Sequence, residues 1–141
     1  IIPFVKLIHS VDSVHLASEI NRQAEKHRRV VDVLVQVNTS GEESKFGCEP
    51  ELALSLIEQI SQMPNLRVVG LMTIGSFSND ENTIRREFRL LRSIFEEAKQ
   101  KFPELPLAEL SMGMTNDYMI AVEEGATILR IGTAIFGERH Y

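Results

Sequence analysis

Short apolar, β-branched segments alternate with longer amphipathic segments along this sequence, and this alternation constrains the fold most strongly. The first kind is expected to form strands at residues 6–9, 30–37, 66–72, 107–110 and 126–131. The intervening segments carry apolar residues at helical spacing, most regularly between residues 84 and 98. Because a strand, a helix and the next strand connect in a right-handed sense, the pattern predicts an α/β fold with a parallel sheet.

About five such strand–helix units are expected, which is too few for a closed barrel of about eight. We therefore predict the later part of a TIM (β/α)8 barrel, as one partial domain over residues 1–141. Because the chain opens on Ile1 rather than Met, we expect a fragment of a longer protein, with roughly three units before it. The alternative is a small open doubly wound sheet. That fold would need a Gly-rich turn after an early strand, and the turn from Ser10 to Ser13 contains no glycine.

The net charge of the chain and the length of its apolar segments argue against several classes of partner. A formal net charge of -5 gives no electrostatic reason to expect nucleic acid. No apolar run approaches the roughly 20 residues that span a bilayer, and no signal peptide opens the sequence. The single cysteine, Cys48, cannot form an intrachain disulfide, which fits a reducing compartment. We therefore expect a cytoplasmic protein, a monomer or weak dimer, without nucleic-acid or membrane partners.

Two strand-to-turn units near the C-terminus predict an anion-binding site. The first turn, residues 111–115 (Ser-Met-Gly-Met-Thr), offers hydroxyl groups, a flexible glycine and closely spaced backbone N–H groups. A short helix is expected to follow, capped at residues 115–117 and ended by Gly125. The second turn, residues 132–134 (Gly-Thr-Ala), follows the last expected strand. The last two loops of a (β/α)8 barrel commonly bind phosphate, so we expect a site for a dianionic phosphate.

Five separated segments carry a resemblance to a known family. They are His9-Ser10-Val11-Asp12-Ser13, residues 36–38 with 43–47, Gly70-Leu71-Met72, residues 111–117 and residues 130–137. Taken in order, they resemble the pyridoxal phosphate homeostasis protein family, whose members are similar to the barrel domain of alanine racemases. The resemblance covers essentially the whole chain. It implies an alanine racemase N-terminal-domain-like barrel that binds pyridoxal 5'-phosphate (PLP), and it admits PLP-dependent apoenzymes as partners.

The resemblance also implies which residues contact the cofactor. They are Ser111, Gly113, Met114, Thr115, Arg130, Gly132, Thr133, Asn38, Met72 and Lys45. Hydroxyl and amide groups of the two C-terminal loops would hold the phosphate, and Arg130 would lie near the pyridine nitrogen. Because a guanidinium keeps its proton, it would leave that nitrogen unprotonated and weaken the cofactor as an electron sink. The lysine that holds the cofactor covalently in this family lies outside this chain. We assign no catalytic residue and no metal ligand.

Several of these residues also have a purely structural interpretation. Arg130 on an apolar strand can pair with a carboxylate, and Ser111 and Thr115 can end a strand and cap a helix. Lys45 lies among acidic residues in a polar loop, where a solvated charge is usual. Asn38 either faces the mouth of the barrel or begins a turn.

Three functions remain open from the sequence. We favour a PLP-binding protein of intracellular PLP homeostasis that carries the cofactor and does not catalyse turnover. The second is a PLP-dependent amino acid racemase, which typically needs a tyrosine from another domain, whereas Tyr118 and Tyr141 are the only tyrosines in this sequence. The third is a barrel enzyme that binds a phosphorylated ligand without PLP. A search for D-amino acid products would separate the first two.

Overall fold

The structure, a computed structural model of the 141-residue chain, describes residues 7–42, 46–76, 78, 80–114 and 117–130. Its elements follow in the order β1 (Leu7–Val11), α1 (Val14–Lys26), β2 (Val31–Gln36), η2 (Pro50–Leu52), α2 (Ala53–Ser61), β3 (Leu66–Met72), α3 (Glu81–Lys101), β4 (Glu109–Met114), α4 (Tyr118–Glu123) and β5 (Ile128–Arg130). The predicted alternation of strands and helices is confirmed.

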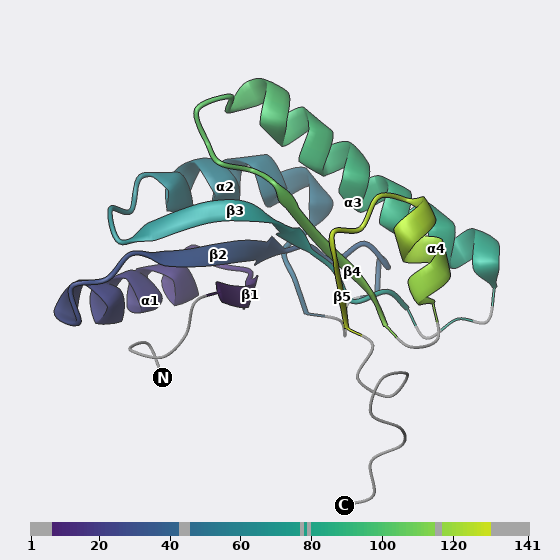
Figure 1. Cartoon of the computed structure of the whole chain (residues 1–141), viewed down its shortest axis with the longest axis horizontal. Helices are drawn as coiled ribbons and strands as arrows, with labels where there is room; N and C mark the ends of the chain where they lie inside the picture. The colour runs from purple at the N-terminus through teal and green to yellow at the C-terminus, as the bar shows by residue number, and fades with distance from the viewer. Residues whose placement is uncertain (1–6, 43–45, 77, 79, 115–116, 131–141) are drawn as a thin grey trace, which may run out of the picture.

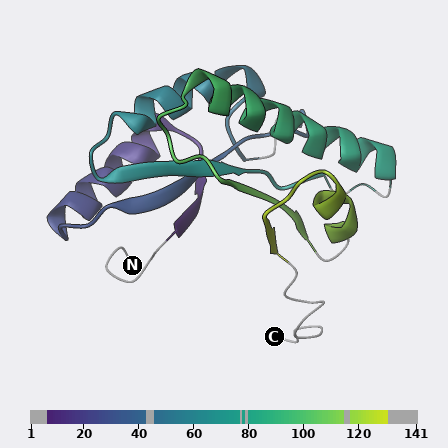
Figure 2. The ribbon, with the colours of Figure 1, turned by 45° about the horizontal axis from the view of Figure 1, so that its top comes forward.

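The described strands form one parallel sheet whose order, β1-β2-β3-β4-β5, follows the sequence. The four described α-helices contribute to one apolar cluster with the sheet, and they lie along its outer face (Figures 1 and 2). Strands β1 and β5, at the two edges of the described sheet, curl away from the helices (Figure 2). A doubly wound sheet would reverse its strand order and carry helices on both faces. The curled sheet with helices outside is part of a TIM barrel, so the predicted fold class is confirmed.

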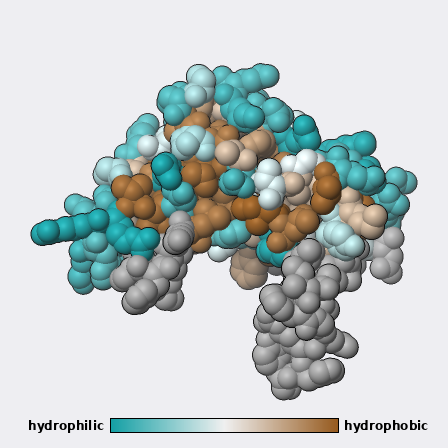
Figure 3. All heavy atoms as spheres, in the orientation of Figure 1, coloured by the Kyte–Doolittle hydropathy of each residue, from teal (hydrophilic) through white to brown (hydrophobic). Residues whose placement is uncertain are grey.

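Consecutive residues of one strand pack into two different apolar clusters. Val33 and Val35 of β2 belong to the larger cluster between sheet and helices, whereas Leu34 packs with Val69 and Met72 on the inner face. All five side chains are buried. Figure 3 shows apolar side chains across the centre of the molecule and hydrophilic ones around its rim. Apolar residues on both faces of a strand are typical of a parallel sheet in a barrel.

Strand β4 begins and ends later than predicted, at Glu109–Met114 instead of 107–110. Residues 111–114 are therefore strand residues, and the turn predicted there is wrong. The cause is pairing on both sides, with β3 on one edge and with β5 on the other, where Arg130 faces Met114. The β4–β5 register shifts between Ser111 and Met114, and Gly113 in this interval has a φ of 103°. Residues 111–114 therefore form the carboxyl end of β4, and their pairing with β5 is irregular around Gly113.

Capping residues mark the ends of two described helices, and those of α4 lie where they were predicted. Ser13 caps α1, since its hydroxyl oxygen accepts the Leu16 N–H at 3.1 Å. Asp117 is the N-cap residue of α4, and Gly125, with a φ of 101°, follows the end of that helix. Within the described ranges, no helix has the length and apolar character needed to cross a membrane.

Three arginines of α3 hold the end of the short helix α4. Arg85 Nη1 donates to Glu124 Oε2 at 2.7 Å, and Arg89 Nε donates to Glu124 Oε1 at 2.9 Å. Arg92 Nη1 donates to the backbone oxygen of Glu124 at 3.2 Å. The side chain of Glu124 is largely buried, so these contacts fix α4, which follows the 111–115 segment, to the longest described helix.

We expect Glu124→Gln to lower the free energy of unfolding by about 1–2 kcal/mol at neutral pH, because it removes the charge that Arg85 and Arg89 contact. Desolvation alone would raise the pKa of Glu124, but hydrogen bonds from both arginines outweigh it and lower the pKa below its ordinary value of 4.5. A carboxylate with a lowered pKa stabilises the fold above its unfolded-state pKa, and it loses this contribution as pH falls through its folded-state pKa. The difference between wild type and variant should therefore shrink once the pH drops below 4.5.

Urea unfolding at a series of pH values measures this difference. Glu96→Gln, at an exposed position of α3, is the matched control and should change stability by less than about 0.5 kcal/mol. A Glu124→Gln effect that stays constant from neutral to acidic pH would show that the charge of Glu124 contributes nothing.

Candidate functional site

Arg130, at the end of β5, is the centre of the candidate site. Its Nη1 donates to the Ser111 hydroxyl at 2.7 Å, and its Nη2 donates to the carbonyl oxygen of Thr73 at 2.8 Å. Among the described residues it makes hydrogen bonds to these uncharged groups and no ion pair. Burial lowers the pKa of Arg130 and the charge of Asp117 opposes that shift, but a guanidinium remains protonated throughout the physiological range. The structural interpretation, an arginine paired with a carboxylate, is not what these described contacts show.

The carboxyl ends of three adjacent strands bring these groups together. Thr73 directly follows β3, and its N–H donates to the carbonyl oxygen of Ser111 in β4 at 3.0 Å. Ser111 pairs with Ile128 of β5, whose side chain packs on the inner cluster. Arg130, two residues further along β5, points to the same side, because side chains alternate along a strand. Ser111 is fully buried, so its hydroxyl and the guanidinium meet inside the curled sheet.

Two buried threonines fix the position of the Thr73 carbonyl group. The Thr73 hydroxyl donates to the carbonyl oxygen of Val37 at 2.8 Å, and it lies 2.9 Å from the hydroxyl of Thr39. These bonds tie the segment after β3 to the segment after β2. Thr73, whose carbonyl group is the second acceptor for Arg130, is therefore held both by the segment after β2 and by Ser111 of β4.

Gly113 and Met114, which were predicted to supply amides to the phosphate, are in contact with helix α4 and its N-cap residue. A Cβ atom on Gly113 would lie 2.5 Å from the Cβ of Ala121, and the φ of 103° also favours glycine at this position. The Met114 N–H donates to Asp117 Oδ1 at 2.6 Å. An anion that takes this amide therefore has to replace the carboxylate of Asp117.

The remaining predicted residues divide into two groups. Asn38 Nδ2 donates to the carbonyl oxygen of Glu42 at 2.8 Å, and its Oδ1 accepts the N–H of Ser40 at 3.1 Å, which favours the turn interpretation. Met72 is buried in the inner cluster, as expected for a lining residue. The other predicted residues lie outside the described ranges: Lys45, Thr115, Gly132 and Thr133.

Sequence reasoning missed three residues that the structure places at this site. They are His9, whose Nδ1 lies 3.5 Å from the Ser111 hydroxyl oxygen, Thr73 and Asp117. Thr73 had a usable signal, because it is the first residue after an expected strand. His9 also ends an expected strand, but its distance from Ser111 depends on the curvature of the sheet.

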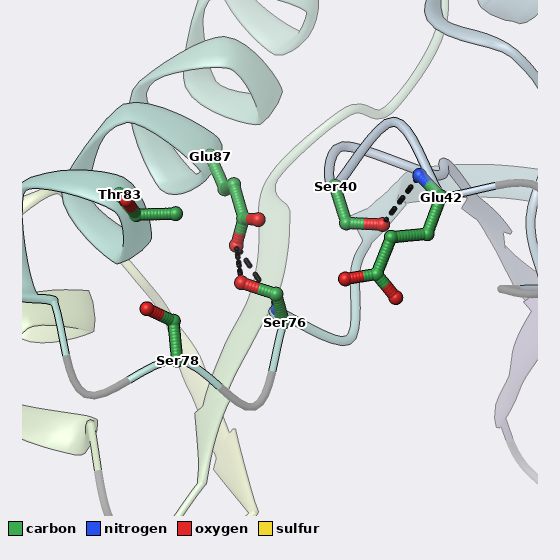
Figure 4. Close-up of a pocket in the computed structure, with 6 residues that line it drawn as sticks. All are labelled: Ser40, Glu42, Ser76, Ser78, Thr83 and Glu87. Atoms are coloured by element: carbon green, nitrogen blue, oxygen red, sulfur yellow. Dashed lines mark hydrogen bonds between the residues drawn. The ribbon is translucent and has the colours of Figure 1, made fainter.

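A polar cavity of about 370 Å³ lies between the segments that follow β2 and β3 (Figure 4). It is lined by Ser40, Glu42, Ser76, Ser78, Thr83 and Glu87. Glu87 is buried, and its Oε2 accepts both the N–H and the hydroxyl of Ser76, at 3.0 and 3.1 Å. With two carboxylates and no cation among these lining residues, the cavity does not suit a dianionic phosphate. Among the described residues, no group of three or more His, Cys, Asp or Glu could hold a metal ion.

Comparison with known proteins places this chain in a family. The model described as "Alanine racemase, N-terminal domain" matches residues 3–140. A pyridoxal phosphate homeostasis protein from Aquifex aeolicus is 47% identical over 137 residues, which are 97% of this chain and 60% of that protein. An unknown protein from Bifidobacterium adolescentis has a similar crystal structure, with a TM-score of 0.91, 46% identity, and coverage of 95% of this chain and 54% of that chain.

The structure of PipY from Synechococcus elongatus PCC7942 with PLP bound is also similar. Its TM-score is 0.85 at 34% identity, and the match covers 96% of this chain and 63% of that chain. The chain thus spans between 54% and 63% of the length of these three relatives. Because the family model covers nearly every residue and the curled sheet agrees with it, the chain belongs to the alanine racemase N-terminal domain family.

Proposed function

We propose that this chain supplies the ring-binding and phosphate-binding parts of a PLP site in a cytoplasmic protein of PLP homeostasis. The protein binds and carries the cofactor rather than catalysing turnover, and it delivers PLP to PLP-dependent apoenzymes. Residues 1–141 act as one partial barrel domain. The similarity to PLP homeostasis proteins and to PLP-bound PipY supports this proposal. The observation that carries it is the guanidinium of Arg130, which two uncharged oxygen atoms hold at the inner carboxyl end of the sheet.

The donor set of Arg130 fits the nitrogen of a pyridine ring. A guanidinium has five N–H groups, and the Ser111 hydroxyl and the Thr73 carbonyl accept two of them. The remaining donors can meet the lone pair of an unprotonated ring nitrogen. Both anchors are uncharged, so they orient the cation without neutralising it.

The same arrangement favours a role in carrying the cofactor and disfavours a role in catalytic turnover. When bound, PLP supplies an electron-withdrawing ring that stabilises a carbanion, and it does so best with a protonated ring nitrogen. Arg130 can only donate at that nitrogen and cannot release its own proton. Opposite Arg130, the ring nitrogen therefore stays unprotonated, which suits a protein that holds and releases the cofactor.

The part of the site that would bind the phosphate includes several residues that lie outside the described ranges. We propose the amides of Gly113 and Met114, together with Thr115, Gly132 and Thr133, as its donors, and Met72, Asn38 and Lys45 as residues close to the cofactor. The Ser111 hydroxyl accepts from Arg130, so we assign it to holding the arginine rather than to donating to the phosphate. Gly113 allows a positive φ within β4 at a position where a Cβ atom would meet Ala121.

Calorimetric titrations of the chain with PLP, pyridoxal and inorganic phosphate test the proposal. Because the site contacts both ends of the cofactor, PLP should bind about tenfold or more tightly than either pyridoxal or phosphate. Binding should be reversible and should resist fixation by borohydride, since the covalent lysine lies outside the chain. Phosphate binding as tightly as PLP would instead support the barrel enzyme that uses a phosphorylated ligand without PLP.

A further inference from the structure

Three strands that are not all neighbours meet at one buried hydroxyl group. Ser111 Oγ of β4 accepts from Arg130 Nη1 of β5 at 2.7 Å, and it lies 3.5 Å from His9 Nδ1 of β1. Strands β2 and β3 separate β1 from β4 in the sheet. The curvature of the inner face therefore brings His9 to the same group that holds Arg130.

The direction of the hydrogen bonds follows from which groups can accept. A hydroxyl oxygen has two lone pairs and one proton, and a guanidinium can only donate to it. Ser111 is fully buried, so a proton without an acceptor would carry a desolvation penalty. Among the described residues, His9 Nδ1 is the acceptor within hydrogen-bond distance of that hydroxyl group.

We propose that His9 is a positioning residue of the cofactor site: its Nδ1 accepts the Ser111 hydroxyl proton, which directs a lone pair of Ser111 Oγ at Arg130. The ring of His9 is then neutral and carries its proton on Nε2. His9 acts on the ligand through Ser111 and Arg130 and does not touch it. This inference rests on the proposed function for its effect on PLP, but the direction of the hydrogen bond does not.

The electrostatic surroundings of His9 agree with a neutral ring. Burial, followed by the positive charge of Arg130 on β5, lowers the pKa of His9 below its ordinary value of 6.5. Ser111 on β4 is uncharged. On β2, Asp32 is the register partner of Leu7 and forms an ion pair with Arg67 of β3, with 2.7 Å between Arg67 Nε and Asp32 Oδ1. Arg130 is therefore the charged group that acts on His9, and it disfavours a second cation beside the same hydroxyl.

The state of the ring can be measured without any ligand. Long-range ¹H–¹⁵N NMR of the ligand-free wild-type chain should show His9 Nδ1 as an unprotonated acceptor at neutral pH. A ring protonated on Nδ1 would reverse the hydrogen bond and overturn the proposal. This result stands whether or not the chain binds PLP, so failure of the proposed function and failure of this inference remain distinguishable.

Variants of His9 test its effect on the cofactor. His9→Asn keeps a side-chain acceptor and should hold PLP within about twofold of wild type, whereas His9→Leu should bind it about three- to tenfold more weakly. His15→Leu, at an exposed position of α1, is the matched control and should bind like wild type. As pH falls through the pKa of His9, wild type should lose affinity relative to His9→Asn. Equal affinities for His9→Asn and His9→Leu, or parallel pH profiles for wild type and His9→Asn, would overturn the positioning role.

Discussion

Gly70→Ala should destabilise the chain by about 3 kcal/mol or more, at the upper end of what overpacking a core costs. Gly70 lies in β3, opposite Glu109 of β4 in the parallel ladder. A Cβ atom at this position would overlap the carbonyl oxygen of Glu109 and lie 2.6 Å from its carbonyl carbon. Backbone atoms of a paired strand cannot rotate away as a flexible side chain can. The methyl group must therefore separate β3 from β4, next to the strand ends that hold Thr73 and Ser111.

Gly75→Ala is the matched control, because it adds the same methyl group just after β3 instead of within it. The nearest atom to that Cβ would be Phe88 Cε1 at 3.2 Å, a side-chain atom that a small shift relieves. We expect a change below about 1 kcal/mol for Gly75→Ala. Urea unfolding followed by circular dichroism compares the two variants. Equal free energies of unfolding for Gly70→Ala and Gly75→Ala would show that the spacing between β3 and β4 adjusts freely at Gly70. The close approach of the two strands would then have no energetic consequence.

The order and type of the elements could be predicted because local pattern determines them. Strand β3 has the predicted bounds, since the turns on either side of this apolar segment define where it begins and ends. Strand β4 was predicted too early because Ser111, Gly113 and Thr115 are residue types common in turns. Pairing with β5 makes these residues part of the ladder, and that pairing joins Ser111 to Ile128 and Met114 to Arg130, which a local pattern does not show.

The candidate site could be predicted only in part, and chiefly through the family resemblance. That resemblance implied a cofactor contact for Arg130, whereas its place on an apolar strand alone suggested a carboxylate partner; the structure gives it uncharged anchors. The hydroxyl of Ser111 was assigned to the phosphate, but a sequence pattern does not show that β5 brings an arginine to it. His9 could not be found in this way, since its contact with Ser111 joins residues that are 102 positions apart.

Arg130→Ala should weaken PLP binding by about 1–3 kcal/mol, or roughly 5- to 150-fold, if the guanidinium hydrogen-bonds the ring nitrogen. Arg130→Lys should fall between wild type and Arg130→Ala. An ammonium keeps the charge, but it lacks the planar fork that reaches the Ser111 hydroxyl and the Thr73 carbonyl at the same time. Calorimetric titration of each variant with PLP measures the difference. Arg67→Ala, which breaks an ion pair at the amino end of β3, is the matched control and should leave PLP affinity unchanged.

The choice of ligand decides which end of the cofactor Arg130 contacts. If it faces the ring nitrogen, Arg130→Ala should weaken the binding of PLP and pyridoxal by similar factors and leave the binding of inorganic phosphate nearly unchanged. An equal loss for phosphate would make Arg130 a phosphate ligand, and the argument for an unprotonated ring nitrogen would then fail. Equal PLP affinity for wild type and Arg130→Ala would remove Arg130 from the site altogether. The contrast between pyridoxal and phosphate is therefore more informative than the size of the loss for PLP alone, because a general weakening of the fold would affect all three ligands together.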